Sequence, residues 1–467
     1  MNIKHTLSEK VMEYLLNNEG KAKISSLEIN KDDVFISLLG NNTHGNQYIP
    51  EAINKGARYI ITDRKLEDNF IFNKILVVDD ILTFLLSTAK IKRNIFKGKV
   101  IGITGSVGKT TLKENLKYFI SQTSTVSVSI KSYNNYLGVL ISLININLSS
   151  SFAIFEIGTN NFEEIKNLTS IIMPSQAIIT NILPTHLENF KNTRNIAIEK
   201  SDIFNPKYNP NIELLVLSQN NTDETYISDL ALKENISNII TFGKTNNQNY
   251  RIEKINKIDD KTFEILIYNN TTTYKFEINK NQLSRINNIL ISLIIFVYNK
   301  LDITTFISST KNVELVEGRG LERKIFINNK IINFIDETYN ASPSTMRMCI
   351  DEFSNIKTMK NQKKILILGD MKELGEEALG FHLEILEYII TLDLNNVIIC
   401  GELMKSALNK LSKKDLKIEL MLNEKLIIKY IKKTLNNNDI LLIKGSNSSL
   451  TNKIGKILLK KRGELIV

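Results

Sequence analysis

The sequence predicts an α/β protein with three domains, and two observations support this expectation. Short apolar runs suited to buried strands alternate with stretches of helical spacing over most of the 467 residues. A first α/β unit ends near residue 96, and a fresh alternating pattern starts near residue 313. Because a chain of this length exceeds one ordinary core, we expect domains at residues 1–97, 98–312 and 313–467.

The N-terminal domain is expected to be small. Residues 33–63 read as a strand, a polar loop, a helix and a second strand. Another apolar run at residues 75–78 and a helix around residues 82–91 complete this α/β unit. The first 16 residues fit an amphipathic helix, since they lack the apolar core of a signal peptide.

The central domain is predicted to hold a parallel sheet with crossover helices. A glycine loop at residues 105–108 separates its first strand from a helix over residues 111–121. The expected strands are residues 100–104, 152–157, 177–182 and 214–217, followed by β-hairpins over 250–278 and a buried helix over 282–298.

The C-terminal domain is predicted to be Rossmann-like and doubly wound, because four more apolar strands alternate with helices. These strands are expected at residues 331–335, 364–368, 396–400 and 440–444.

Composition excludes several classes of protein. The net charge of +10 comes from lysines scattered among Ile and Asn, so we expect no nucleic-acid partner, although an anionic small substrate fits. Cys349 and Cys400 lack disulfide or metal-ligand spacing, which favours the cytoplasm. The longest apolar run, residues 289–298, is shorter than the ~20 residues of a membrane span. We therefore expect no integral membrane contact.

The stretch GITGSVGKTTLKE, which begins at Gly102, predicts a phosphate-binding loop. Backbone N–H groups of a glycine turn and a helix N-terminus point at phosphate oxygens, while a lysine neutralises charge and a hydroxyl binds Mg²⁺. The pattern G-x-x-x-x-G-K-[ST] would need glycine at Ile103, so the loop is a shortened variant with Gly105 and Gly108 as its glycines. The predicted nucleotide-binding residues here are Thr104, Gly105, Ser106, Val107, Gly108, Lys109, Thr110 and Thr111.

Three further residues stand where this chemistry would need them. Glu156 ends an apolar strand at the sheet edge where ligands gather, so it is a candidate Mg²⁺ ligand. His186 follows the next strand, and Lys200 lies on the helix after it. Each taken alone has an ordinary alternative, namely a strand-end acid, a structural histidine and a solvated lysine.

The motifs TGSVGKTT, KSYNNYLGV, FEIGTNN, TNILPTHLENF, EGRG, DETYNASP, LGDMKELG and KGSN occur in this order. Together they resemble the Mur ligases of peptidoglycan synthesis, over nearly the whole chain. DETYNASPSTM and LGDMKELGEEALGFH are similar to the member that adds D-alanyl-D-alanine to UDP-N-acetylmuramoyl-tripeptide. The segment DDVFISLLGNNTHGNQYIPEAINKGA resembles the UDP-binding domain of that enzyme.

The resemblance implies an ATP-dependent amide ligation through an acyl phosphate, with ATP and Mg²⁺ as cofactors. It also implies a monomer in the cytoplasm, with UDP-N-acetylmuramoyl-tripeptide and D-alanyl-D-alanine as substrates. Such chemistry consists largely of positioning and charge stabilisation. Because ATP contacts would come from two domains, we expect the C-terminal domain to close onto the central one.

By matching position, the resemblance gives Lys109, His186 and Lys200 catalytic roles. Lys109 would hold the β- and γ-phosphates, and Thr110 and Glu156 would serve a first Mg²⁺. His186 and Lys200 would build a second metal site. In this family that lysine is often carbamylated, which turns an ammonium into a carboxylate-like ligand.

The resemblance also implies contacts with the rest of the nucleotide and with the acceptor. Asn288 would contact adenine, Arg319 the phosphates and Asp336 the ribose. Tyr339 and Asn340 would lie beside the nucleotide or the dipeptide. The substrate-side residues would be Ser26, Asn134, Asn135 and Thr159.

The chain departs from the family pattern at five positions, which are Leu27, Ser132, Ser284, Arg285 and Asn447. Ser284 and Arg285 stand where the family has His and Asn on the adenine side. Leu27 and Asn447 replace arginines, and Ser132 replaces an asparagine.

Three alternatives stay open. The sibling Mur ligase that adds the third amino acid is the nearest, but its D-N-P-R-type motif is not apparent. A folylpolyglutamate-synthetase relative would not ordinarily carry the uridine-type N-terminal domain. A nucleotide-binding scaffold without activity would not need both metal sites.

Overall fold

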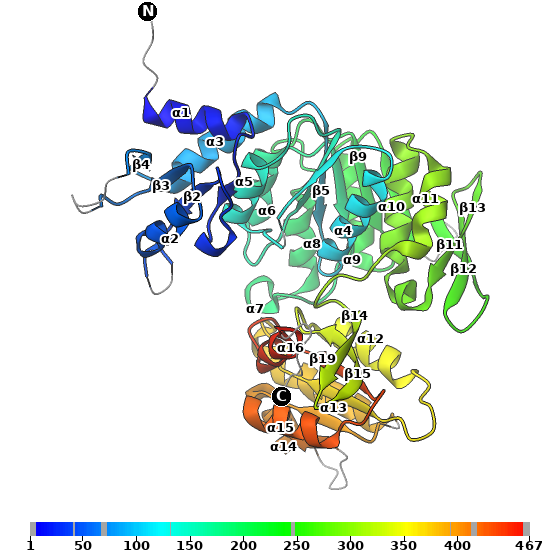
Figure 1. Cartoon of the computed structure of the whole chain (residues 1–467). Coiled ribbons are helices and arrows are strands. Elements are labelled where there is room, and N and C mark those ends of the chain that lie inside the picture. Colours follow the sequence, from blue (N-terminus) through cyan, green and yellow to red (C-terminus); the bar gives the residue numbers. More distant parts are fainter. Residues whose placement is uncertain are drawn as a thin grey trace, which may run out of the picture.

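A computed structural model describes residues 6–40, 43–66, 72–130, 132–243, 248–392, 394–411 and 418–460. It confirms the predicted α/β class, with three sheets that follow one another along the chain (Figure 1). The first described helix, α1 (Leu7–Leu16), carries most of the predicted N-terminal helix, of which residues 1–5 lie outside the described residues. We keep the predicted divisions at 97/98 and 312/313 as working domain limits.

The N-terminal domain holds a four-stranded parallel sheet in the order β1-β2-β3-β4. The strands are β1 (Ala22–Lys23), β2 (Val34–Ser37), β3 (Tyr59–Thr62) and β4 (Ile75–Val77). The helices after α1 are α2 (Ile49–Asn54) and α3 (Ile81–Ile95). Every residue of β2 is buried, because helices cover a parallel sheet on both faces.

The central domain holds a nine-stranded sheet in the order β13-β12-β11-β10-β9-β8-β5-β7-β6. Strands β5 to β10 run parallel to their neighbours. Strand β11 pairs parallel with β10 and antiparallel with β12, and β12 pairs antiparallel with β13, as the hairpin pattern indicates. The strands are β5 (Lys99–Thr104), β6 (Val126–Val128), β7 (Phe152–Glu156), β8 (Gln176–Ile179), β9 (Leu214–Ser218), β10 (Ile239–Gly243), β11 (Tyr250–Lys257), β12 (Thr262–Tyr268) and β13 (Thr273–Asn279).

The central helices cover this sheet, and the most apolar of them are the most buried. In α10 every residue from Asn288 to Phe296 is buried, which explains its continuous apolar run. The helices are α4 (Lys109–Ser121), α5 (Tyr136–Ile144), α6 (Glu164–Ile172), α7 (Leu187–Phe190), α8 (Thr193–Ser201), α9 (Thr222–Lys233), α10 (Ile286–Tyr298) and α11 (Ile303–Ser309).

The C-terminal domain holds a six-stranded sheet in the order β14-β15-β19-β16-β17-β18, parallel except for the β14–β15 hairpin. Its strands are β14 (Leu321–Ile327), β15 (Lys330–Glu337), β16 (Lys364–Leu368), β17 (Val397–Ile399), β18 (Ile418–Leu420) and β19 (Ile440–Lys444). Its helices are α12 (Pro343–Ser354), α13 (Ala378–Ile390), α14 (Glu402–Lys410), α15 (Glu424–Thr434) and α16 (Leu450–Lys460).

Two strands of this sheet were missed by the sequence prediction of four. Both lie at edges of the sheet, where one side of a strand faces solvent. β14 (LERKIFI) therefore contains three consecutive charged residues and alternates in burial instead of forming one long apolar run, and β18 has only three residues.

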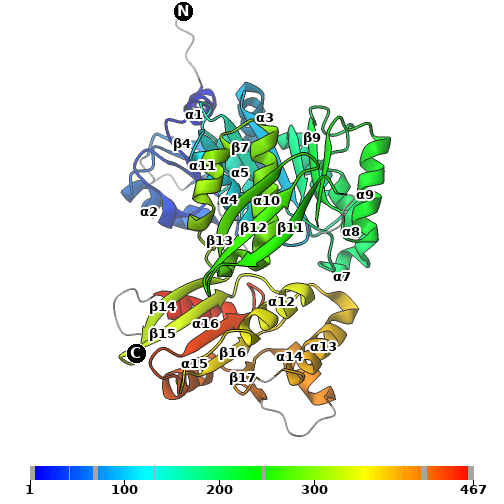
Figure 2. The same cartoon turned by 90° about the vertical axis from the view of Figure 1, so that its right-hand side faces the viewer.

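The N-terminal and central domains share one continuous core, in which residues of α1, α3, α5 and α6 pack together. The C-terminal domain lies below the central domain in both views (Figures 1 and 2). In the described ranges, no helix combines the length and apolarity that a membrane crossing requires.

Lys92 joins α3 to the C-terminal end of α1 in the N-terminal domain. Its side chain is fully buried, and its ammonium donates to the carbonyl oxygens of Leu15 (2.9 Å) and Leu16 (2.6 Å) and to Asn18 Oδ1 (2.8 Å). The last carbonyls of a helix have no partner within the helix, so this lysine caps the C-terminus of α1.

We expect Lys92→Met to lower the free energy of unfolding by about 3 kcal/mol, because buried carbonyl oxygens lose charged donors. Thermal and urea unfolding followed by circular dichroism would measure the change. The control is Lys90→Met, an exposed position on the same helix, which should stay within about 0.5 kcal/mol of the parent. Equal losses for both variants would contradict the capping role.

Candidate active site

The predicted phosphate loop joins β5 to α4, at the carboxyl end of a strand whose two neighbours are β7 and β8. This is a topological switch point of the sheet, the usual place for a ligand in a doubly wound fold. Gly105 and Gly108 adopt positive φ values of 137° and 91°. A Cβ at Gly105 would lie 2.0 Å from Thr180 Oγ1, so the turn requires glycine here.

Lys109 begins α4, and its side chain bends back over the loop. Its Nζ donates to the carbonyl oxygens of Gly105 (2.7 Å) and Ser106 (3.4 Å). Burial lowers the pKa of Lys109, and the nearby charge of Arg319 lowers it further. The ammonium thus lies at the cradle that the backbone N–H groups form, where an anion would be held.

Glu156 ends β7 and is buried beside the loop. Its Oε2 accepts a hydrogen bond from Thr110 Oγ1 (2.7 Å), and its Oε1 accepts one from Asn134 Nδ2 (2.8 Å). A carboxylate and a hydroxyl in contact are hard oxygen donors, which fit Mg²⁺ when phosphates and water complete the shell. In the described part of the chain, no three His, Cys, Asp or Glu side chains gather as a metal cluster.

His186 and Lys200 approach the same region from α7 and α8. His186 precedes α7 in a left-handed conformation (φ 52°), and its Nδ1 lies 2.6 Å from Glu373 Oε2 of the C-terminal domain. This pairing lowers the pKa of Glu373. Lys200 is buried, and its pKa lies well below the ordinary value, because of burial first and of the Lys109 charge second. Its amine therefore loses its proton more readily than that of an exposed lysine.

Arg319 reaches the loop from the C-terminal domain. Its Nη2 donates to Thr110 Oγ1 (3.0 Å), the hydroxyl that also contacts Glu156. The Arg319 guanidinium lies 4.7 Å from the ring centroid of Tyr339, a cation–π contact that holds it in place. The phosphate loop and the C-terminal sheet therefore already touch through one side chain.

Two cavities flank Arg319. One has a volume of about 170 Å³ and lies over the loop; the other has about 270 Å³ and extends toward α10. The predicted residues that line the first are Ser106, Val107, Gly108, Lys109, Asn134, Asn135, Glu156, Thr159, His186, Arg319, Tyr339 and Asn340. Those that line the second include Val107, Gly108, Thr111, Asn288, Arg319 and Asn340.

Several predicted residues have side chains committed to local structure. Asp336 is buried at the end of β15 and accepts from the Gly318 N–H and from the N–H and hydroxyl of Thr338. Asn135 caps α5 by accepting from the Gly138 N–H. Thr159 donates to the carbonyl oxygen of Asn161 (2.7 Å) and to Glu199 Oε1 (3.3 Å). The nucleotide and substrate contacts of Asp336, Asn135 and Thr159 stay predictions.

Other predicted residues lie away from both cavity walls. Thr104, Gly105 and Thr110 lie in or just after the loop, behind its lining residues. Ser26 is in the N-terminal domain, where its Oγ donates to Glu51 Oε2 (2.7 Å), and its neighbour Leu27 is 75% exposed.

The sequence prediction missed residues that shape the loop from outside it. Asn181 Oδ1 accepts from the Val107 N–H (3.0 Å), and Thr180 Oγ1 donates to the carbonyl oxygen of Val107 (2.7 Å). Both follow β8, next to β5, so their position after a strand was the available signal. Glu373 and Lys444 stood within the motifs LGDMKELG and KGSN, but no role was assigned to them.

Comparison with known proteins agrees with this architecture. A UDP-N-acetylmuramoyl-tripeptide–D-alanyl-D-alanine ligase of Rickettsia prowazekii is 32% identical over 94% of each chain. A crystal structure of MurF from Acinetobacter baumannii superposes with a TM-score of 0.75 at 21% identity, covering 94% of this chain and 93% of that one. MurF ligase from Thermotoga maritima in complex with ADP gives 0.72 at 24% identity, covering 96% and 99%. The two structural likenesses show a shared fold.

Two family descriptions match the parts of the chain that form the cavities. Residues 103–296 match the Mur ligase middle domain, and residues 323–447 match the domain described as Mur ligase, glutamate ligase domain. These matches span the phosphate loop, Glu156, His186 and Lys200 on one side and Asp336 and Glu373 on the other. With 32% identity to a relative over nearly its full length, this chain belongs to the Mur ligase family.

Proposed function

We propose that this protein is an ATP-dependent ligase that joins D-alanyl-D-alanine to UDP-N-acetylmuramoyl-tripeptide, giving the pentapeptide precursor of peptidoglycan. The observation that carries the proposal is the contact of Arg319 with Thr110, which brings a cation of the C-terminal domain to the phosphate loop. The activity named for the Rickettsia prowazekii relative, which matches 94% of this chain, supports the choice of substrates.

The reaction has two steps. A terminal carboxylate oxygen of the tripeptide attacks the γ-phosphorus of ATP, and the bond from that phosphorus to the bridging oxygen of ADP breaks. The amine of D-alanyl-D-alanine then attacks the acyl carbon and forms a tetrahedral intermediate. Phosphate leaves with the electrons of the C–O bond, and the amine gives up a proton. Chemistry of this kind depends chiefly on positioning and on charge stabilisation.

Residues of this chain are suited to hold the charge that moves in these steps. Lys109 and the loop N–H groups would bind the β- and γ-phosphates, and Arg319 would neutralise the transferred group from the opposite side. Thr110 and Glu156 would hold Mg²⁺, which supplies a positive charge on the phosphate oxygens when bound. Burial, and then the charge of Lys109, lower the pKa of Lys200, which raises the share of the neutral amine, the form that reacts with carbon dioxide to give a carbamate.

Further residues are suited to contact the acceptor substrate and the adenine. Asn134 contacts Glu156 and lines the cavity over the loop, so it is suited to the acceptor side. Asn288 lines the second cavity and would lie at the adenine; Ser284 and Arg285 line the same cavity. Both cavities lie within one chain, which is consistent with a monomer. The reaction belongs in the cytoplasm, where cells supply ATP and nucleotide-linked precursors.

The direct test measures phosphate release from ATP and Mg²⁺ with UDP-N-acetylmuramoyl-tripeptide, with and without D-alanyl-D-alanine. We expect release to require both substrates and the pentapeptide product to appear by mass. Release with the dipeptide precursor and a free diamino acid would instead support the sibling ligase. ATP binding without release under either condition would support a scaffold.

Lys109→Ala should lower kcat by roughly 10²–10³-fold, because the phosphoryl group loses a positioned charge. The same phosphate-release assay measures the loss. The matched control is Lys117→Ala on the same helix, whose side chain is 52% exposed and pairs with Glu114 at 3.7 Å. Full activity in the Lys109 variant would contradict its assignment to the phosphates.

Glu156→Gln should raise the Mg²⁺ concentration needed for half-maximal activity, by about ten-fold or more, since an amide oxygen is a weaker ligand than a carboxylate. A titration of activity against Mg²⁺ measures this shift. Glu114→Gln, on the surface of α4, should leave the titration unchanged. An unchanged midpoint with a lowered maximum would show that Glu156 acts in another way.

A further inference from the structure

Arg285 of the central domain contacts the C-terminal domain at two points. It ends the 3₁₀ turn at Lys280–Arg285, directly before α10, and its side chain is only 11% exposed. Its Nη2 donates to Glu337 Oε1 (2.7 Å) and to the carbonyl oxygen of Arg319 (3.2 Å). Its Nη1 donates to Ser284 Oγ (2.8 Å), which orients the guanidinium. The proposed chemistry uses none of these contacts.

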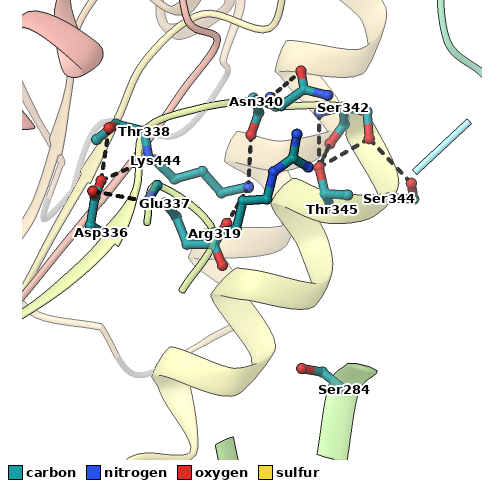
Figure 3. Close-up of polar contacts among 12 residues, drawn as sticks. Ser284, Arg319, Asp336, Glu337, Thr338, Asn340, Ser342, Ser344, Thr345 and Lys444 are labelled. Atoms are coloured by element: carbon teal, nitrogen blue, oxygen red, sulfur yellow. Dashed lines mark hydrogen bonds and ion pairs between the residues drawn. The ribbon is translucent and has the colours of Figure 1, made fainter. Parts of the chain in front are cut away.

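Glu337 connects Arg285 to a buried lysine. Its Oε2 accepts from Lys444 Nζ (3.1 Å), and Lys444, at 2% exposure, also donates to the carbonyl oxygen of Asn340 (3.0 Å). Figure 3 shows the Lys444 side chain between Glu337 and Asn340, with Arg319 beside them. We call Arg285, Glu337, Lys444 and the Asn340 carbonyl the Arg285 cluster. A buried carboxylate with two cationic partners is fully paired, and removing one partner is costly.

The backbone beside Arg319 leaves room for this cluster. Gly320 has a φ of 92°, which favours glycine. A Cβ at Gly320 would lie 2.4 Å from Arg285 Nη2 and 2.8 Å from Glu337 Oε1. Any side chain at this position would therefore displace the pair. The approach of Arg285 to the C-terminal domain thus depends on a specific residue in that domain.

The two ends of Arg319 are held by the same central domain. Its carbonyl oxygen accepts from Arg285, and its guanidinium donates to Thr110 of the phosphate loop. We propose that Arg285 is a positioning residue, which holds the C-terminal domain against the central domain and sets the Arg319 guanidinium at the loop before nucleotide binds. The part that concerns nucleotide rests on the proposed function.

The contacts of Arg285 should change the free-energy difference between the touching and the separated arrangement of the two domains. A contact present only when the two domains touch stabilises that arrangement over a separated one, and it raises the fraction of binding-competent protein. Charge-assisted hydrogen bonds from a forked guanidinium are stronger than neutral ones, and lysine cannot reproduce the fork. Arg285 should therefore affect domain arrangement even in protein without ligand.

The first experiment compares the radius of gyration of full-length, ligand-free variants by small-angle scattering. Arg285→Met should increase it, and Arg285→Lys should fall between Arg285→Met and the parent. Arg323→Met is the control, because Arg323 forms a 3.5 Å ion pair with the exposed Glu317 inside the C-terminal domain. Circular dichroism checks that each variant is folded. An unchanged radius for Arg285→Met would overturn the proposal.

The second experiment separates positioning from direct contact with the base. ADP binding in the presence of Mg²⁺ is measured for Arg285→Met, Arg319→Met and the double variant. Arg285→Met should weaken binding about ten-fold, and the double variant should lose little more than Arg319→Met alone. Losses that add would assign Arg285 a nucleotide contact of its own and overturn the positioning role. If the parent binds no ADP, the proposed function fails while the scattering result still decides this proposal.

Discussion

The candidate active site depends on contact between the central and C-terminal domains, in which the Arg319 guanidinium donates to Thr110 Oγ1. Parallel strands collect their carboxyl ends at one edge of a sheet, so each sheet offers half of a site. The central sheet supplies the phosphate loop and Glu156, and the C-terminal sheet supplies Arg319 and Glu373. A site for phosphoryl transfer forms only where these two edges meet.

The charges of Lys109 and Arg319 make the boundary between the two domains suited to phosphates. Lys109 and Arg319 both approach Thr110 and Glu156, and burial lowers the pKa of Lys109 because an ammonium loses hydration there. A polyanionic ligand would raise the pKa of that lysine again. The Glu156 carboxylate only partly neutralises Lys109 and Arg319, so the site is suited to phosphates. Burial likewise lowers the pKa of Lys200.

Backbone with positive φ values occurs on both sides of the same boundary. His186 and Glu373, which pair across the domains, both have positive φ values, 52° and 65°. Glutamate disfavours that conformation, which costs on the order of 1 kcal/mol or more. Gly318 and Gly320, on either side of Arg319, also have positive φ. Strain held at both faces of a boundary is consistent with contacts selected for geometry at some cost in stability.

The sequence by itself determined the α/β class, the phosphate loop and most strands, because apolar runs and glycine spacing are local properties of the chain. It placed Lys109, Glu156 and Arg319 in motifs whose order resembles one family. It missed β1, β6, β10, β14 and β18; all of these except β10 are edge strands, which bury only part of their surface and show no long apolar run.

Tertiary structure alone decided which of these residues meet. Arg285 read as a departure from the family pattern, yet the fold brings it 2.7 Å from Glu337, 52 residues later in the chain. Asp336 is expected at a ribose, and that contact stays a prediction; the fold shows that its carboxylate also accepts from the Gly318 and Thr338 backbone N–H groups. Side-chain partners across sheet edges depend on how two domains pack, and no local pattern in a sequence records that packing.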